Sequence, residues 1–176
     1  MKFLNTIICL MVLSGYAHSQ TGDWKNLFDG ETLNGWSIHS GLAKYHVEDG
    51  AIVGTSVPNS PNTFLCTDQS FSDFILEFEV YLVSPELNSG VQFRSQIAPE
   101  ELTFWFRNNE GQPAQRTIPK DRVYGYQVEI ALEEGGASGG VYDEARRAFM
   151  IYRPVQGSAA FNAFKDDQWN HYRVEC

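Results

Sequence analysis

Residues 74–82 alternate strictly between apolar and polar side chains, and this alternation limits the possible folds more than any other feature of the sequence. The apolar side chains occupy the even positions, Phe74, Leu76, Phe78, Val80 and Leu82. Glu77 and Glu79 lie between them. Successive side chains of a strand point to opposite faces, so this period of two predicts a half-buried antiparallel strand.

Further short segments with strand character follow the same logic. They cover residues 44–47, 51–54, 63–66, 89–94, 124–132, 149–152 and 169–175. Turn-forming residues separate them, as in Asp49-Gly50 and in Asn88-Ser89-Gly90. No stretch of ten or more residues has a helical period. Many short strands with frequent turns predict an all-β sandwich or barrel in a single domain.

The N-terminus has the pattern of a targeting segment. Lys2 precedes an apolar run over residues 7–13, and Ala17-His18-Ser19 supplies small residues before Gln20. The run is too short to span a bilayer. We therefore expect a signal peptide over residues 1–19, a β-sandwich domain over residues 20–176, and a secreted or periplasmic protein. The alternative is a buried N-terminal helix.

Charge narrows the range of partners. The chain has 22 acidic against 13 basic residues and a net charge of −9, so it repels phosphate backbones and anionic membrane surfaces. We expect no nucleic-acid partner and no membrane insertion. Beyond the targeting segment only Cys66 and Cys176 remain, and Cys66 is interpreted as a small core residue. The four histidines are scattered along the sequence, so we expect no zinc site. A calcium site with oxygen ligands stays an open alternative.

Polar residues on two of the expected strands could form one binding face. Gln92 and Arg94 alternate with apolar residues on one strand, and Gln127 and Glu129 do so on another. If these strands are neighbours, amides, a guanidinium and a carboxylate converge, which is the composition of a sugar site. The alternative is a solvated outer face with salt bridges.

A second dense cluster is Tyr142-Asp143-Glu144-Ala145-Arg146-Arg147. It follows a glycine-rich loop over residues 135–140, where the backbone could approach a ligand closely. The alternative is a surface turn with local ion pairs. Trp24, Trp36 and Trp105 are candidate sugar platforms, although burial is the commoner fate of tryptophan.

Several segments together resemble the 3-keto-disaccharide hydrolase family, once called domain of unknown function 1080. The motifs that carry the resemblance are Leu27-Phe28-Asp29-Gly30 with Leu33-Asn34-Gly35-Trp36, Val47-Glu48-Asp49-Gly50, Asn88-Ser89-Gly90-Val91-Gln92-Phe93-Arg94, Gly125-Tyr126-Gln127-Val128-Glu129, Gly140-Val141-Tyr142-Asp143-Glu144 and Trp169-Asn170-His171-Tyr172. Each motif is weak alone, but they occur in the family's order across residues 24–175.

The resemblance implies a concanavalin A-like jelly roll, a β-sandwich of two antiparallel sheets. It also implies export from a bacterium. Family members continue beyond the Trp-Asn-x-Tyr strand with further strands, so we expect this chain to be missing its C-terminal strands.

The activity implied by the resemblance is hydrolysis of glycosides already oxidised to a ketone at C3. A base removes the C2 hydrogen, the enolate expels the C1 substituent, and water adds afterwards. The expected catalytic residues are Glu129 as base, Arg94 beside the enolate, and Tyr142 or Glu144 as proton donor. The expected substrate-binding residues are Gln127, Gln92 and Asp143. No cofactor is expected.

Two other functions stay open at this point. The first is a non-catalytic carbohydrate-binding module, because jelly rolls of this type carry lectins as well as enzymes. The second is a structural cell-surface domain that neither binds nor turns over a sugar.

Overall fold

The computed structural model describes residues 8–18, 24–84, 88–131 and 137–176, and every regular element in them is a strand. The strands are β1 (Ile8–His18), β2 (Trp24–Asn26), β3 (Trp36–Ser40), β4 (Lys44–Glu48), β5 (Ala51–Thr55), β6 (Thr63–Thr67), β7 (Ile75–Leu82), β8 (Asn88–Ile97), β9 (Leu102–Arg107), β10 (Pro113–Ile118), β11 (Val123–Ala131), β12 (Val141–Glu144), β13 (Met150–Tyr152) and β14 (Asn170–Glu175). A membrane-spanning helix is absent from the described part of the chain.

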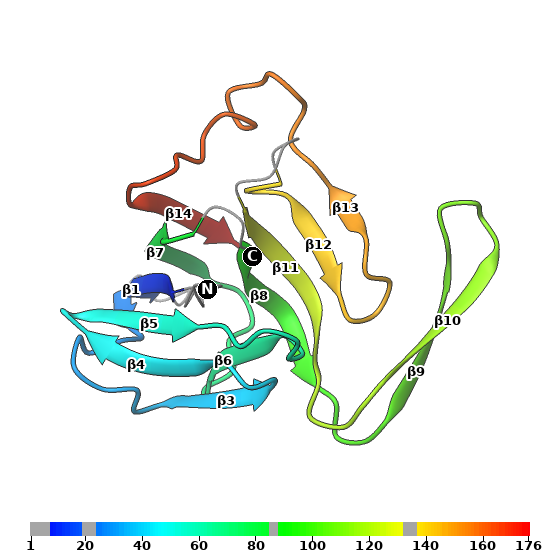
Figure 1. Cartoon of the computed structure of the whole chain (residues 1–176), viewed down its shortest axis with the longest axis horizontal. Coiled ribbons are helices and arrows are strands. Elements are labelled where there is room, and N and C mark those ends of the chain that lie inside the picture. Colours follow the sequence, from blue (N-terminus) through cyan, green and yellow to red (C-terminus); the bar gives the residue numbers. More distant parts are fainter. Residues whose placement is uncertain (1–7, 19–23, 85–87, 132–136) are drawn as a thin grey trace, which may run out of the picture.

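The strands form two larger antiparallel sheets and two ribbons (Figure 1). The six-stranded sheet has the order β14-β7-β1-β5-β4, with β2 paired to β1. The four-stranded sheet has the order β13-β12-β11-β8. The ribbons are β3-β6 and β9-β10, and the second projects from the body of the molecule as a long hairpin (Figure 1).

The core lies between the two larger sheets. Phe78 and Val80 of β7 and Ile52 of β5 are buried in one cluster with Ile130 of β11. Because Ile130 belongs to the other sheet, its place in this cluster shows that the sheets face one another. The fold is therefore all-β and antiparallel, in agreement with a β-sandwich; the jelly-roll connectivity stays a prediction.

The alternation in residues 74–82 is confirmed. Phe78, Val80 and Leu82 are buried in β7, whereas Glu79 is exposed. The expected C-terminal strand is confirmed as β14, where Val174 is buried and the ring of Tyr172 stacks on Phe78 at 5.3 Å between centroids. The other segments with strand character are confirmed as β4, β5, β6, β8, β11 and β13.

The N-terminal segment forms β1, which pairs with β5 on one side and β7 on the other. The predicted cleavage before Gln20 lies outside the described residues and stays a prediction. Residues 135 and 136 of the predicted glycine-rich loop also lie outside the described residues.

Candidate functional site

Five of the predicted site residues share one face of the four-stranded sheet. Gln127 lies opposite Gln92 of β8 on one side and opposite Tyr142 of β12 on the other. Val128 and Ile130 of β11 point into the core, so the alternating Gln127 and Glu129 point to the opposite face. By the same alternation Glu144 shares this face with Tyr142. We call these five residues, Gln92, Gln127, Glu129, Tyr142 and Glu144, the polar face.

A directed chain of hydrogen bonds crosses the polar face. Ser95 Oγ donates to Gln92 Oε1 at 2.7 Å, and Gln92 Nε2 donates to Gln127 Oε1 at 2.6 Å. Gln127 Nε2 in turn donates to Glu129 Oε1 at 2.6 Å. Each amide thus accepts at its oxygen and donates at its nitrogen, which fixes both amides and one carboxylate oxygen in a defined orientation.

Glu129 is buried, and a glycine gives its neighbour Gln127 the space to reach it. Gly90 lies opposite Glu129 on β8. A Cβ at Gly90 would lie 2.5 Å from Cγ and Cδ of Gln127, so the Gln127 side chain occupies that space. The prediction of a turn at Asn88-Ser89-Gly90 is therefore wrong: these residues begin strand β8, and the glycine leaves the space that the Gln127 amide occupies.

At the other end of the polar face, Glu144 forms a largely buried ion pair with Arg122. Arg122 also donates to the carbonyl of Asn62 at 3.2 Å, and its guanidinium lies 5.0 Å from the centre of the Phe64 ring. Burial raises the pKa of Glu144, although the charge of Arg122 opposes this effect. Glu144 therefore retains a proton to higher pH than an exposed glutamate.

Tyr142 is influenced by both carboxylates of the polar face. Burial raises the pKa of its phenol most, the charge of Glu144 raises it further, and Glu129 adds to this. The base and acid candidates thus flank a half-buried phenol that stays protonated at neutral pH.

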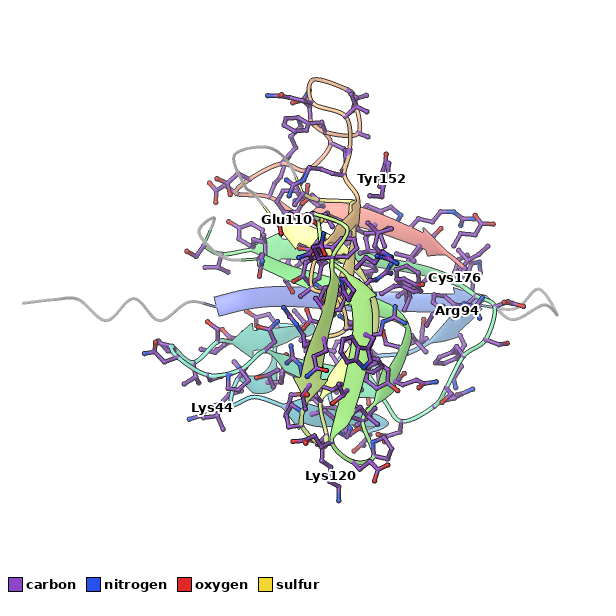
Figure 2. The ribbon with its side chains drawn as sticks, turned by 90° about the vertical axis from the view of Figure 1, so that its right-hand side faces the viewer. Lys44, Arg94, Glu110, Lys120, Tyr152 and Cys176 are labelled. Carbon is purple, nitrogen blue, oxygen red and sulfur yellow. The ribbon has the colours of Figure 1, made fainter. Side chains whose placement is uncertain are left out.

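The hairpin β9–β10 brings a further cation to this region. Figure 2 shows the hairpin in front of the four-stranded sheet. The charge of Arg116 on β10 acts on both Tyr142 and Glu144, lowering their pKa values. Phe104 of β9 packs against Tyr124 of β11 at 5.2 Å between ring centroids, which anchors the base of the hairpin. Arg116 is exposed and forms no ion pair with another described residue.

The structure places Arg94 away from the polar face. Arg94 Nη2 donates to Asp73 Oδ1 at 2.6 Å, and Arg94 adopts a φ of 48°. The pairing of β8 with β11 is irregular between Phe93 and Gln96, so two residues interrupt the alternation here. The expected convergence of Arg94 with Gln92, Gln127 and Glu129 is therefore found only for the last three.

Asp143 also lies apart, on the opposite face of β12 from Tyr142 and Glu144. Its side chain is completely buried and accepts from Nε of Arg146 at 2.7 Å and from Nε of Arg147. Arg146 in addition lies over the Tyr126 ring, 4.7 Å from its centre. Asp143 thus organises the turn between β12 and β13 through local ion pairs, as in the alternative interpretation of this cluster, but its side chain is buried and does not lie on the surface.

Three residues of this region were not expected from the sequence: Ser95, Arg116 and Arg122. Arg122 pairs with a glutamate 22 positions later, and no local spacing reveals such a pair. Arg116 lies on a strand that the sequence analysis did not identify. Only Ser95 had a signal, because it directly follows the motif that ends in Phe93-Arg94.

The structure also shows the surroundings of the tryptophan and cysteine residues that the sequence singled out. Trp105 is 71% exposed, whereas Trp36 is partly buried and donates from Nε1 to the carbonyl of Leu27 at 2.9 Å. Cys66 and Cys176 are not bonded to each other, and burial raises the pKa of Cys66 to about 11. The residues that the structure describes contain no cluster of three or more metal-ligating side chains.

A comparison with protein families identifies a match over most of the chain. The family model described as 3-keto-alpha-glucoside-1,2-lyase-like domain matches residues 23–176, which include all the residues of the polar face. No curated protein matches the chain.

Proposed function

The chain belongs to the family of 3-keto-alpha-glucoside-1,2-lyase-like domains, and from this premise we propose that it cleaves glycosides that carry a ketone at C3. The single observation that supports the proposal most is the polar face itself. It combines an oriented buried carboxylate, two amides and a second carboxylate with a raised pKa on one surface.

The reaction begins with removal of the C2 hydrogen, which the neighbouring ketone makes acidic. Glu129 takes this proton, and the electron pair of the C2–H bond forms an enolate with the C3 carbonyl. Gln127 holds the Glu129 carboxylate by its amide, which fixes the direction of the base. Gln92 and the remaining amide hydrogens bind sugar hydroxyl groups.

The second step breaks the bond between C1 and the leaving oxygen. The enolate electrons form the C1–C2 double bond while Glu144 donates its proton to the departing alcohol. The raised pKa of Glu144 suits it to this role, since a general acid must still carry its proton at the working pH. Water then adds across the double bond, so that the net reaction is hydrolysis. Tyr142 lies between the two carboxylates and is the alternative donor.

The enolate needs a positive charge near the C3 oxygen. Arg94, which the sequence suggested for this role, is engaged with Asp73. We assign the role to Arg116, because its charge reaches Tyr142 and Glu144 and it lies on the hairpin in front of this sheet (Figure 2).

The test uses a 4-nitrophenyl 3-keto-glucoside and the unoxidised 4-nitrophenyl glucoside as substrates. We expect release of nitrophenol from the keto form alone, with transient absorbance from the unsaturated sugar. Release from the unoxidised glucoside at a similar rate would instead indicate displacement at C1 by paired carboxylates. No release of nitrophenol from either substrate would favour the alternative function, a non-catalytic carbohydrate-binding module.

That second function has one observation in its favour. Both carboxylates of the polar face are already hydrogen-bonded within the protein, Glu129 to Gln127 and Glu144 to Arg122. Such a face can bind a sugar without reacting. Calorimetric binding of the unoxidised glucoside with no turnover of its keto form would support this function.

We also propose export, with residues 1–19 as the signal peptide and residues 20–176 as the secreted or periplasmic domain. Expression in a bacterium followed by N-terminal sequencing of the exported protein tests this. A first residue of Gln20 is expected, and an intact N-terminus on cytoplasmic protein would contradict it.

A further inference from the structure

A serine, a histidine and an aspartate form a hydrogen-bonded chain on the ribbon β3–β6, outside the polar face. Ser37 Oγ lies 3.1 Å from His39 Nε2, and His39 Nδ1 lies 2.7 Å from Asp121 Oδ1. Ser37 and His39 are two positions apart on β3, so they share one face of the ribbon. Asp121 belongs to the connection between β10 and β11, which lies beside the end of β3 (Figure 1).

The direction of the two hydrogen bonds follows from the chemistry of the three groups. The hydrogen bond from His39 lowers the pKa of Asp121 most, and the backbone N–H of Ser40 lowers it further, so Asp121 is a carboxylate at neutral pH. A carboxylate only accepts, so Nδ1 of His39 carries the hydrogen. In a neutral imidazole Nε2 is then the acceptor, and Ser37 donates to it. A histidine held in this way is oriented to take a proton from a serine.

The backbone around Asp121 holds its carboxylate in place. Asp121 Oδ2 accepts from the backbone N–H of Ser40 at 3.2 Å, and Ser40 Oγ donates to the carbonyl of Asp121 at 3.1 Å. Both residues have left-handed φ angles, 68° at Asp121 and 67° at Ser40, which are uncommon for residues other than glycine. Two strained positions thus meet where the carboxylate orients the imidazole, and strain of this kind occurs at functional sites.

Ser37 is the nucleophile that this face of the ribbon provides. Its side chain points away from Trp36, which packs against the core, and Ser37 is partly exposed. Cys66 lies directly opposite Ser37 on β6. Burial raises the pKa of the Cys66 thiol to about 11, and the charge of Asp121 adds to this effect, so the thiol stays protonated and unreactive at neutral pH. The hydroxyl beside His39 is therefore the activated group.

We propose that Ser37, His39 and Asp121 form a catalytic site separate from the polar face, which hydrolyses small carboxylic esters through an acyl group on Ser37. Ser37 Oγ attacks the ester carbonyl carbon while its proton passes to His39 Nε2. The bond from this carbon to the alcohol oxygen then breaks, and the alcohol leaves with that proton. Water attacks the acyl group next, giving a proton to His39, and the acid leaves as Ser37 Oγ recovers this proton. Asp121 is a positioning residue that fixes the imidazole tautomer.

Hydrolysis of 4-nitrophenyl acetate by the full chain tests the proposal. Ser37→Ala and His39→Gln should each lower the rate above buffer by at least roughly 10²-fold, because one removes the nucleophile and the other its base. His46→Gln is the matched control for His39→Gln, since His46 of β4 also pairs with a carboxylate, that of Glu48, at 3.0 Å. Ser72→Ala, at an exposed serine, is the control for Ser37→Ala. Neither control should change the rate.

The positioning role of Asp121 has its own readout. Asp121→Asn keeps an oxygen for the N–H of Ser40 but removes the charge beside the imidazole. It should therefore lower kcat on the ester and leave KM nearly unchanged, which a merely structural role would not do. Glu129→Gln should hydrolyse the ester at the rate of the unsubstituted chain. The proposal thus does not depend on the glycoside chemistry, and the two can fail separately.

Covalent labelling locates the reacting atom. A fluorophosphonate should phosphonylate Ser37 with loss of fluoride, as seen by mass spectrometry of the digested protein, and the label should be absent from His39→Gln. A rate unchanged in Ser37→Ala, no label on Ser37 in the unsubstituted chain, or an equal label in His39→Gln would each overturn the proposal. The three side chains would then only fasten the β10–β11 connection to β3. If His39→Gln does not fold, Ser37→Ala decides, because it removes a single oxygen atom.

Discussion

Gln127 donates to Glu129 from two residues away on the same strand, at 2.6 Å between Nε2 and Oε1. Side chains at this spacing share a face of the sheet, but a long amide reaches its neighbour only where no other side chain intervenes. Gly90 provides that space on β8. The glycine of the Asn-Ser-Gly motif on β8 therefore makes room for a contact within β11 that orients the candidate base.

Replacing the base is the first prediction. Glu129→Gln should lower kcat on the 3-keto-glucoside by roughly 10²–10⁴-fold, because an amide cannot accept the C2 proton. The sugar should still bind, with affinity measured by calorimetry. Glu79→Gln, an exposed glutamate of β7, is the control. Unchanged turnover in Glu129→Gln would remove this residue from the chemistry.

The second prediction concerns pH. Glu144 is active as a donor only while protonated, and burial raises its pKa above the ordinary 4.5. The rate should therefore fall as pH rises through this raised pKa, and Glu144→Gln should lower kcat and abolish this limb of the pH–rate profile. If the limb persists in Glu144→Gln and disappears in Tyr142→Phe, the phenol is the donor.

The third prediction tests the space at Gly90. Gly90→Ala places a Cβ where Gln127 lies, and the displaced amide should lose its bond to Glu129. We expect a loss of stability of about 1–3 kcal/mol in urea unfolding and a drop in kcat comparable to that of Gln127→Ala. Ser89→Ala, one residue earlier, should change neither. Full activity in Gly90→Ala would show that the amide is not needed.

The fourth prediction separates stability from chemistry at Asp143. Asp143→Asn leaves two guanidinium groups without their buried partner and should cost about 2–4 kcal/mol in urea unfolding; this is below the usual value for a fully buried pair, because both arginines are partly exposed. Substrate affinity of the folded variant should be unchanged. Weakened binding at unchanged stability would restore the substrate-binding role predicted from the sequence.

The fifth prediction concerns the hairpin cation. Arg116→Ala should reduce kcat by about 10²–10³-fold if its charge stabilises the enolate, with little effect on stability because the side chain is exposed. Arg107→Ala on the paired strand is the matched control, since Arg107 donates to the carbonyl of Gly111 near the turn of the hairpin. Equal losses in both variants would point to the hairpin's shape instead of the charge.

The sequence predicted the strands that have one apolar and one polar face. It did not reveal β9, because consecutive aromatic residues at Phe104, Trp105 and Phe106 hide the period of two, and only Trp105 is strongly exposed. Arg116 on the paired strand β10 could therefore not be placed near the site.

The candidate site was predictable as far as the alternation continued. The alternation of polar and apolar residues placed Gln92, Gln127 and Glu129 on one face, as the structure has them, because β8 and β11 are neighbours in regular register at these positions. It failed at Arg94, where the irregular pairing turns the side chain toward Asp73. Backbone irregularities of this kind depend on the partner strand, which the local sequence does not contain.

The hairpin β9–β10 is bonded to itself and to neither of the larger sheets within the described strands. Insertions or deletions near its turn, at residues 108–111, would therefore change what reaches the polar face without disturbing the sandwich. A lineage, or a designer, could alter the surroundings of the polar face by editing this one hairpin while the strands that carry the polar face keep their sequence.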